Sequence, residues 1–254
     1  MLLLLSLACA PKGEEATPTF DEMNIAAIVD FHGDGAEPAV LGLRDWLVEH
    51  ASDWEATDWP GGYTLGAVDE DDFASIPHSE NVDWAQVLGV GTPLRVRGTV
   101  DGYAEAAVEA DQSFAHASYD VWDRRIVGGS AEGFLAGGEM QTDNTIEKTD
   151  LGVTIPYSAN KDYRWFGDVL AAITWVPEEG WGPDGVNGIL CGFTIELWYE
   201  EDGEVRWYNG QWTQVATIFG ADMPEDVLID QFIDGTVDYM EGTEAFVMGE
   251  YTGE

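Results

Sequence analysis

The residues of this sequence that could perform chemistry are few, and the densest group of them lies near the start. In VDFHGDG, His32 stands between Asp30 and Asp34. Imidazole and carboxylate together suit zinc and transition metals. The spacing does not follow a calcium-binding EF-hand, because the twelfth residue counted from Asp30 is Leu41. Asp30, His32 and Asp34 are therefore a candidate metal site, and the alternative is a solvated polar loop.

Motifs of known catalytic chemistry are absent from the chain. It contains no HExxH, GxSxG, CxxC or P-loop pattern. The nearest approach to a nucleophile elbow, GGSAEG at 128–133, has Glu132 where glycine is required. The sequence therefore assigns no catalytic residue and no cofactor, and it leans away from an enzyme.

The charge of the chain excludes one class of partner. Its 49 Asp and Glu residues face 10 Lys and Arg residues, which gives a net charge of −39. Such a surface repels phosphate backbones, so we expect no nucleic-acid binding. Only three of the cations are lysines, Lys12, Lys148 and Lys161. In PLRVRGTV, Arg95 and Arg97 are either paired structurally or, if they point into a cavity, able to orient an anionic headgroup.

The first residues have the features of a targeting signal followed by a flexible tether. The apolar run LLLLSLA, residues 2–8, is too short to span a bilayer. SLAC, ending at Cys9, resembles the lipobox of bacterial lipoproteins, although no basic residue precedes the apolar run. The resemblance implies cleavage before Cys9, lipidation of its thiol and a lipid-anchored place in the bacterial cell envelope, in the outer membrane or facing the periplasm. A plain secretory signal or a buried N-terminal strand are the alternatives.

These features divide the chain into three parts. We expect a signal peptide over 1–8, a flexible tether over 9–19, where proline, small and charged residues mix without periodicity, and a single α+β domain over 20–254. Within the domain, apolar residues at helical spacing predict a helix over about 38–51. From about 93 the period changes to two, and strand-like runs follow near 103–109, 113–127, 133–140, 145–155 and 163–176.

The clearest local structure is a β-hairpin. Asp202-Gly203 favours a two-residue turn that pairs Trp198 with Trp207. One face of the hairpin is apolar, whereas the face of Trp198 and Trp207 is otherwise polar. We therefore expect an antiparallel sheet with one face in the core and the other largely polar. Exposure of the two tryptophans on the polar face would favour a surface interaction module over a ligand pocket.

The chain ends in a long predicted helix. Asp222 could cap it, with Glu225 as the capping-box partner. Its apolar face holds two glycines, which suggest a close approach to the sheet; the face is formed by Leu228, Phe232, Gly235, Tyr239, Gly242 and Phe246.

The order of helices, long antiparallel strands and a terminal helix resembles a helix-grip, or START-like, fold; a lipocalin-like barrel is the alternative. The resemblance implies an apolar cavity between the sheet and the last helix. Candidate ligand-binding residues are Arg95, Arg97, Trp198, Trp207, Phe232 and Tyr239.

Three functions fit this expectation. The first is a lipid-anchored envelope protein that binds or carries an apolar small ligand. The second is a surface structural or interaction module without a pocket. The third is a hydrolase or cyclase in a START-like cavity, which needs a buried carboxylate–His or carboxylate–Tyr pair. The sequence leaves the ligand and the oligomeric state open.

Overall fold

The structure is a computed structural model that describes residues 18–51, 62–150, 153–216 and 224–251. Cys9, the tether up to residue 17 and the predicted cap Asp222 lie outside the described residues. The strands form one antiparallel sheet of nine, in the order β1-β2-β9-β8-β6-β5-β4-β3, with β7 paired to β8. The strands are β1 (Tyr63–Leu65), β2 (Leu88–Val96), β3 (Tyr119–Gly129), β4 (Glu139–Asp150), β5 (Val153–Phe166), β6 (Val169–Trp175), β7 (Gly180–Trp181), β8 (Gly188–Glu201) and β9 (Glu204–Val215).

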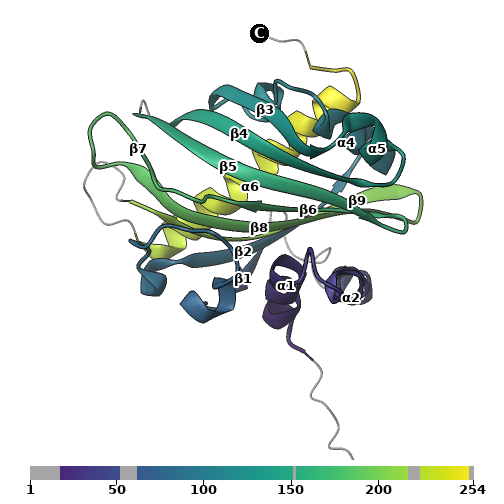
Figure 1. The fold of residues 1–254 in the computed structure, drawn as a ribbon, viewed down its shortest axis with the longest axis horizontal. Coiled ribbons are helices and arrows are strands. Elements are labelled where there is room, and N and C mark those ends of the chain that lie inside the picture. The colour runs from purple at the N-terminus through teal and green to yellow at the C-terminus, as the bar shows by residue number, and fades with distance from the viewer. Residues whose placement is uncertain (1–17, 52–61, 151–152, 217–223, 252–254) are drawn as a thin grey trace, which may run out of the picture.

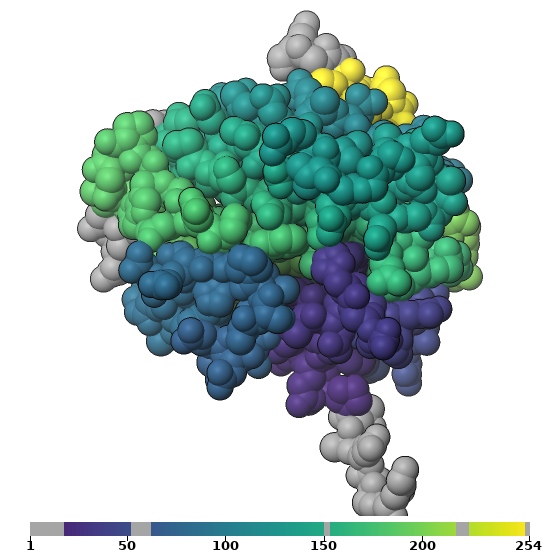
Figure 2. All heavy atoms as spheres, in the orientation of Figure 1, coloured from purple at the N-terminus to yellow at the C-terminus, as the bar shows by residue number. Residues whose placement is uncertain are grey.

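Helices cover both faces of this sheet (Figure 1). They are α1 (Phe20–Val29), α2 (Ala36–Glu49), α4 (Val100–Ala107), α5 (Ala131–Leu135) and α6 (Glu225–Val247), with short 3-10 turns η1 (Glu70–Phe73), η2 (Trp84–Gln86) and η3 (Ser113–Ala115). The space-filling view shows the purple N-terminal helices and the blue segment after residue 62 together on one side of the molecule (Figure 2). No helix among the described residues is long and apolar enough to cross a membrane.

The two largest of the four hydrophobic clusters among the described residues lie on opposite faces of the sheet. On one face, Phe193, Ile195 and Leu197 of β8 pack with buried residues of α1 and α2. On the other face, Trp198 and Trp207 pack with Met240 of α6 and with α4. The sheet is therefore buried on both faces, and the terminal helix lies against one of them as the helix-grip arrangement requires. A lipocalin-like barrel is wrong, because the sheet is open and its order ends at β1 and β3.

The β8–β9 hairpin follows the predicted register. Trp198 pairs with Trp207, and Glu201 pairs with Glu204. Asp202 and Gly203 both have positive φ, 54° and 83°, as a type I′ turn requires.

Two strand predictions are wrong, and a third run, 163–176, spans the turn at Gly167 between β5 and β6. The run 103–109 falls mainly in the helix α4, where Val100, Tyr103 and Ala104 are buried with helical spacing and Thr99 caps the first turn through Gly102 N–H. The run 133–140 begins in the helix α5 and reaches the strand β4 only at its end.

The exposure of Trp198 and Trp207 that a surface interaction module would require is not found. Their exposed fractions are 4% and 1%. The same face of the hairpin also carries Glu196 and Asn209, which are buried as well. The polar side chains misled the interpretation, because this face meets α6 and not solvent.

Candidate functional site

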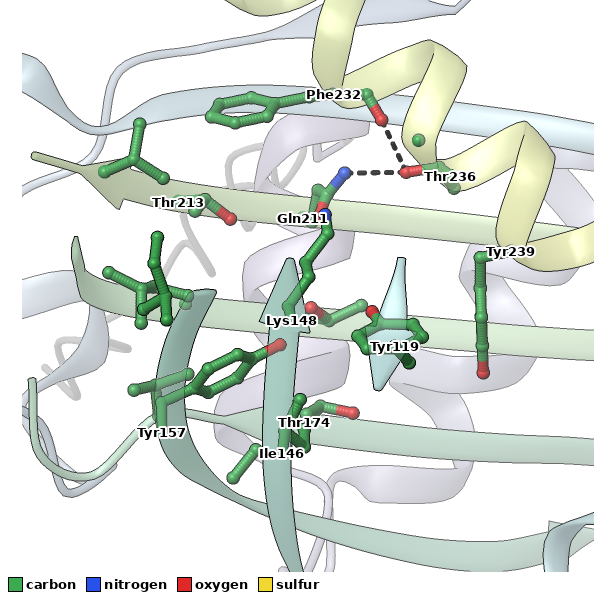
Figure 3. Close-up of a pocket in the computed structure, with 18 of the residues that line it drawn as sticks. Tyr119, Ile146, Lys148, Tyr157, Thr174, Gln211, Thr213, Phe232, Thr236 and Tyr239 are labelled. Carbon is green, nitrogen blue, oxygen red and sulfur yellow. Dashed lines mark hydrogen bonds between the residues drawn. The ribbon is translucent and has the colours of Figure 1, made fainter. Parts of the chain in front are cut away.

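A cavity of about 290 Å³ lies between the sheet and α6. Strands β3, β4, β5, β6, β8 and β9 supply its wall, and α6 closes it over Leu228, Phe232, Gly235 and Tyr239 (Figure 3). Much of the wall is apolar, formed by Trp122, Ile146, Val153, Ile155, Val176, Ile189, Val215, Leu228 and Phe232. Such a concave, mainly apolar enclosure with a few polar groups is the usual form of a small-ligand site.

The two glycines of the predicted stripe on α6 have different roles. At Gly242 an added Cβ would collide with the carbonyl oxygen of Ala115, so the close approach is to η3 and not to the sheet. At Gly235 an added Cβ would meet nothing within 4 Å. Gly235 lines the cavity, so its missing side chain leaves room there.

Hydrogen bonds join α6 to the cavity floor. The Gln211 side-chain amide on β9 donates to Thr236 Oγ1 at 2.8 Å, and that hydroxyl donates to the Phe232 carbonyl at 2.7 Å (Figure 3). The first of these bonds joins β9 to α6, and the second lies within the helix.

A polar cluster occupies one part of the wall. Lys161 Nζ donates to Glu196 Oε2 and, at 3.3 Å, to the Tyr239 hydroxyl. Asn209 Nδ2 donates to Glu196 Oε1 at 3.2 Å. Lys161 and Glu196 are almost fully buried, with side chains 3% and 2% exposed. The ammonium also lies near the rings of Tyr163, Trp198 and Tyr239.

Burial and charge act in opposite directions on Lys161 but in the same direction on Tyr239. Burial is the largest single effect on Lys161 and favours its neutral amine, but the Glu196 carboxylate together with Tyr163 and Tyr239 outweighs it, so the pKa of Lys161 is raised and the side chain stays charged. Burial, together with the negative charge of Glu196, raises the pKa of Tyr239, which therefore keeps its proton.

A second group of polar residues lies on the β3–β5 side of the cavity. Figure 3 shows Lys148 extending from β4 toward Gln211, with Tyr119 and Tyr157 beside it. The Lys148 ammonium is 5.9 Å from the centre of the Tyr119 ring. Burial and the neighbouring Tyr119 raise the pKa of Tyr157, so its hydroxyl remains a hydrogen-bond donor.

The cavity takes in two of the six predicted ligand-binding residues, Phe232 and Tyr239. Trp198 and Trp207 pack beneath it in the core, where Trp207 meets the Tyr239 ring at 5.2 Å. Their burial and the existence of the cavity contradict what a surface module without a pocket requires.

Arg95 and Arg97 are not among the residues that line the cavity. Arg95 Nη1 lies 3.2 Å from Glu204, whereas Arg97 binds Glu244 of α6 at 2.6 Å and Glu250 at 2.8 Å. The structural pairing considered from the sequence is therefore what the structure shows for both.

The candidate metal residues do not converge. His32 Nε2 lies 2.9 Å from Asp162 Oδ2, a partner outside the predicted group. In the described ranges, no three His, Cys, Asp or Glu side chains are placed to hold a metal ion.

Sequence reasoning missed Lys148, Glu196 and Asn209 as residues of the cavity. A signal for Lys148 was available, because lysine occurs only three times in a chain with 49 acidic residues. The hairpin register places Glu196 and Asn209 on one face, but nothing in the sequence places Lys148 of β4 on the same wall.

The fold and the cavity define the chain as an α+β helix-grip protein, START-like in arrangement. No protein-family model and no curated protein matches the chain. Solved structures with a similar arrangement include a STAR-related lipid transfer protein from Xanthomonas axonopodis, with 10% identity, a TM-score of 0.49, and coverage of 76% of this chain and 97% of that one. The ZhuI aromatase/cyclase from Streptomyces has 8% identity, a TM-score of 0.44, and coverage of 66% and 97%. Similarities at these sequence identities and TM-scores concern the fold alone and say nothing about a ligand.

Proposed function

We propose that this protein binds an apolar small ligand in the cavity between the sheet and α6. The observation that carries the proposal is the cavity itself, about 290 Å³ with a mainly apolar wall. Ligand pockets commonly begin at about 300 Å³. At roughly 30 Å³ for each water-sized group, the space accommodates on the order of ten non-hydrogen atoms.

The experiment fills the cavity with a larger side chain placed on α6. Gly235→Leu adds a side chain where the structure has open space and removes a helix-weakening glycine. We expect the wild type to bind decanol, measured by calorimetry and native mass spectrometry, and Gly235→Leu to lose that binding while remaining folded. Gly42→Leu is the matched control, because Gly42 lies in helix α2, away from the cavity, and also has nothing within 4 Å of its added Cβ.

Two results would contradict the proposal. One is a wild-type protein that binds no apolar probe and carries none after purification. The other is a Gly235→Leu variant that binds decanol as the wild type does, which would place the binding elsewhere.

We further propose that a lipid on Cys9 anchors this binding protein in the bacterial cell envelope. The support is the lipobox-like SLAC at the end of an apolar run. The expected result is that the wild type incorporates an acyl label and sediments with membranes, whereas Cys9→Ser does neither. A Cys9→Ser variant that stays with the membranes, beside an unlabelled wild type, would refute the anchor.

A further inference from the structure

The charges on the cavity wall differ from those of the rest of the chain. Two of its three lysines, Lys148 and Lys161, line the cavity, although the chain has a net charge of −39. Among the Asp and Glu residues, only Glu196 is part of that lining in the described part of the chain. The wall therefore holds two ammonium groups and one carboxylate.

One of the two ammonium groups is already neutralised. Lys161 is paired with Glu196 in a buried ion pair, and both partners are almost fully buried. Asn209 and Tyr239 occupy further hydrogen-bonding positions of this pair. A ligand gains little by approaching Lys161, because its charge is balanced inside the wall.

Lys148, the other ammonium group of the wall, is not part of this ion pair. Its ammonium has the Tyr119 ring as a neighbour at 5.9 Å, and among the side chains that the structure describes no carboxylate comes within 4.0 Å of it. The side chain is half-buried and extends into the cavity toward Gln211 (Figure 3). Its charge therefore has no ion-pair partner among the described side chains, in a mainly apolar enclosure where a charge interacts more strongly than in water.

We propose that the ligand is a singly charged acidic amphiphile, of the fatty-acid type, whose carboxylate binds Lys148. This inference rests on the proposed function and specifies its ligand class. The apolar tail would lie between Ile146 on the sheet and Phe232 on α6, which both line the cavity.

The charge count favours one negative charge over two. A single unbalanced ammonium matches one carboxylate, whereas a phosphate monoester carries about −1.5 to −2 at neutral pH. The surplus would be desolvated without a partner, inside a protein whose own field repels anions.

The test compares decanoate with decanol, which share a chain length and differ in the acidic group. Both are titrated calorimetrically against the wild type, Lys148→Met and Lys148→Arg. In Lys148→Met, we expect decanoate to bind about 10- to 100-fold more weakly and decanol to bind as before. Lys148→Arg, which keeps the charge, is expected to retain decanoate within about threefold of the wild type.

Arg125→Gln is the matched control for the loss of one positive charge. Arg125 also lies on the β3–β4 side of the sheet, but its side chain is 76% exposed and pairs with Asp143 on the surface. We expect its affinity for decanoate to equal that of the wild type. Thermal melts of each variant confirm that the compared proteins are folded.

The outcomes separate this inference from the function on which it rests. If decanol binds and Gly235→Leu abolishes that binding, but Lys148→Met takes up decanoate like the wild type, only the acidic ligand is refuted. An equal loss in Arg125→Gln would also refute it, because the effect would then come from overall charge. If neither probe binds the wild type, both proposals fail.

Discussion

The Lys161–Glu196 pair makes a sharp prediction about stability. Lys161→Met keeps most of the side-chain volume but leaves the Glu196 carboxylate buried without its cation. Breaking a buried pair from one side typically costs about 3–5 kcal/mol. Both side chains here are at most 3% exposed, so water cannot take the place of the lost partner. The variant also loses the contacts of the ammonium with three aromatic rings.

That loss is large for a protein of this size. Folded domains are stable by about 5–15 kcal/mol, so the variant would lose a substantial share of the free energy of unfolding. With about 2–4 °C of melting temperature for each kcal/mol, we expect a decrease of about 6–20 °C. Urea unfolding followed by tryptophan fluorescence measures the free energy directly, with an unchanged m-value as the check that the same surface unfolds.

The pH dependence has a defined sign. The raised pKa of Lys161 means that the pair stabilises the folded wild type fully below the pKa of an unfolded lysine, about 10.4. This stabilisation is lost as the pH rises through the higher pKa of the folded state. Lys161→Met lacks this contribution at every pH. The difference in unfolding free energy between the wild type and the variant is therefore expected to shrink as the pH rises above about 10.4.

A double variant tests whether the stranded charge is the cause. Lys161→Met with Glu196→Gln removes both charges and keeps an oxygen for Asn209, so we expect most of the stability to return. Arg125→Gln, which removes an exposed cation, should change stability by no more than about 0.5 kcal/mol. A single variant that loses less than about 1 kcal/mol, or a double variant no better than the single one, would refute the reasoning.

Two further predictions concern packing. Gly242→Ala should lower the free energy of unfolding by about 1–3 kcal/mol, because its Cβ would collide with the Ala115 carbonyl. Gly235→Ala in the same helix should raise that free energy by up to about 1 kcal/mol. Equal effects of the two variants in urea unfolding would contradict the assigned contacts. Burial raises the pKa of Cys191 to about 11, so in the Cys9→Ser variant this thiol should resist iodoacetamide at about pH 8 until the protein is unfolded. Rapid labelling of the native variant, seen by mass spectrometry, would refute its burial.

Sequence patterns were reliable where the determining interactions are local. The turn at Asp202-Gly203 sets the hairpin register, because positive φ at both positions selects one turn geometry. The helix α6 and its apolar stripe were also predicted correctly, although one part of the stripe faces the cavity and Gly242 packs against η3. The α4 segment was misread, because Val100, Tyr103 and Ala104 carry the helical period in a run that was interpreted with period two.

The sequence by itself determined the charge of the chain, the strand and helix order that makes a helix-grip fold, and the side chains that share each face of the hairpin. Only the tertiary structure decided what covers those faces. Alternation along a strand reports which side chains point the same way, but it cannot say whether that side meets water or α6. For this reason Trp198 and Trp207 are buried, and Lys148, brought beside β9 and α6 by the curvature of the sheet, faces a cavity that no spacing along the chain could reveal.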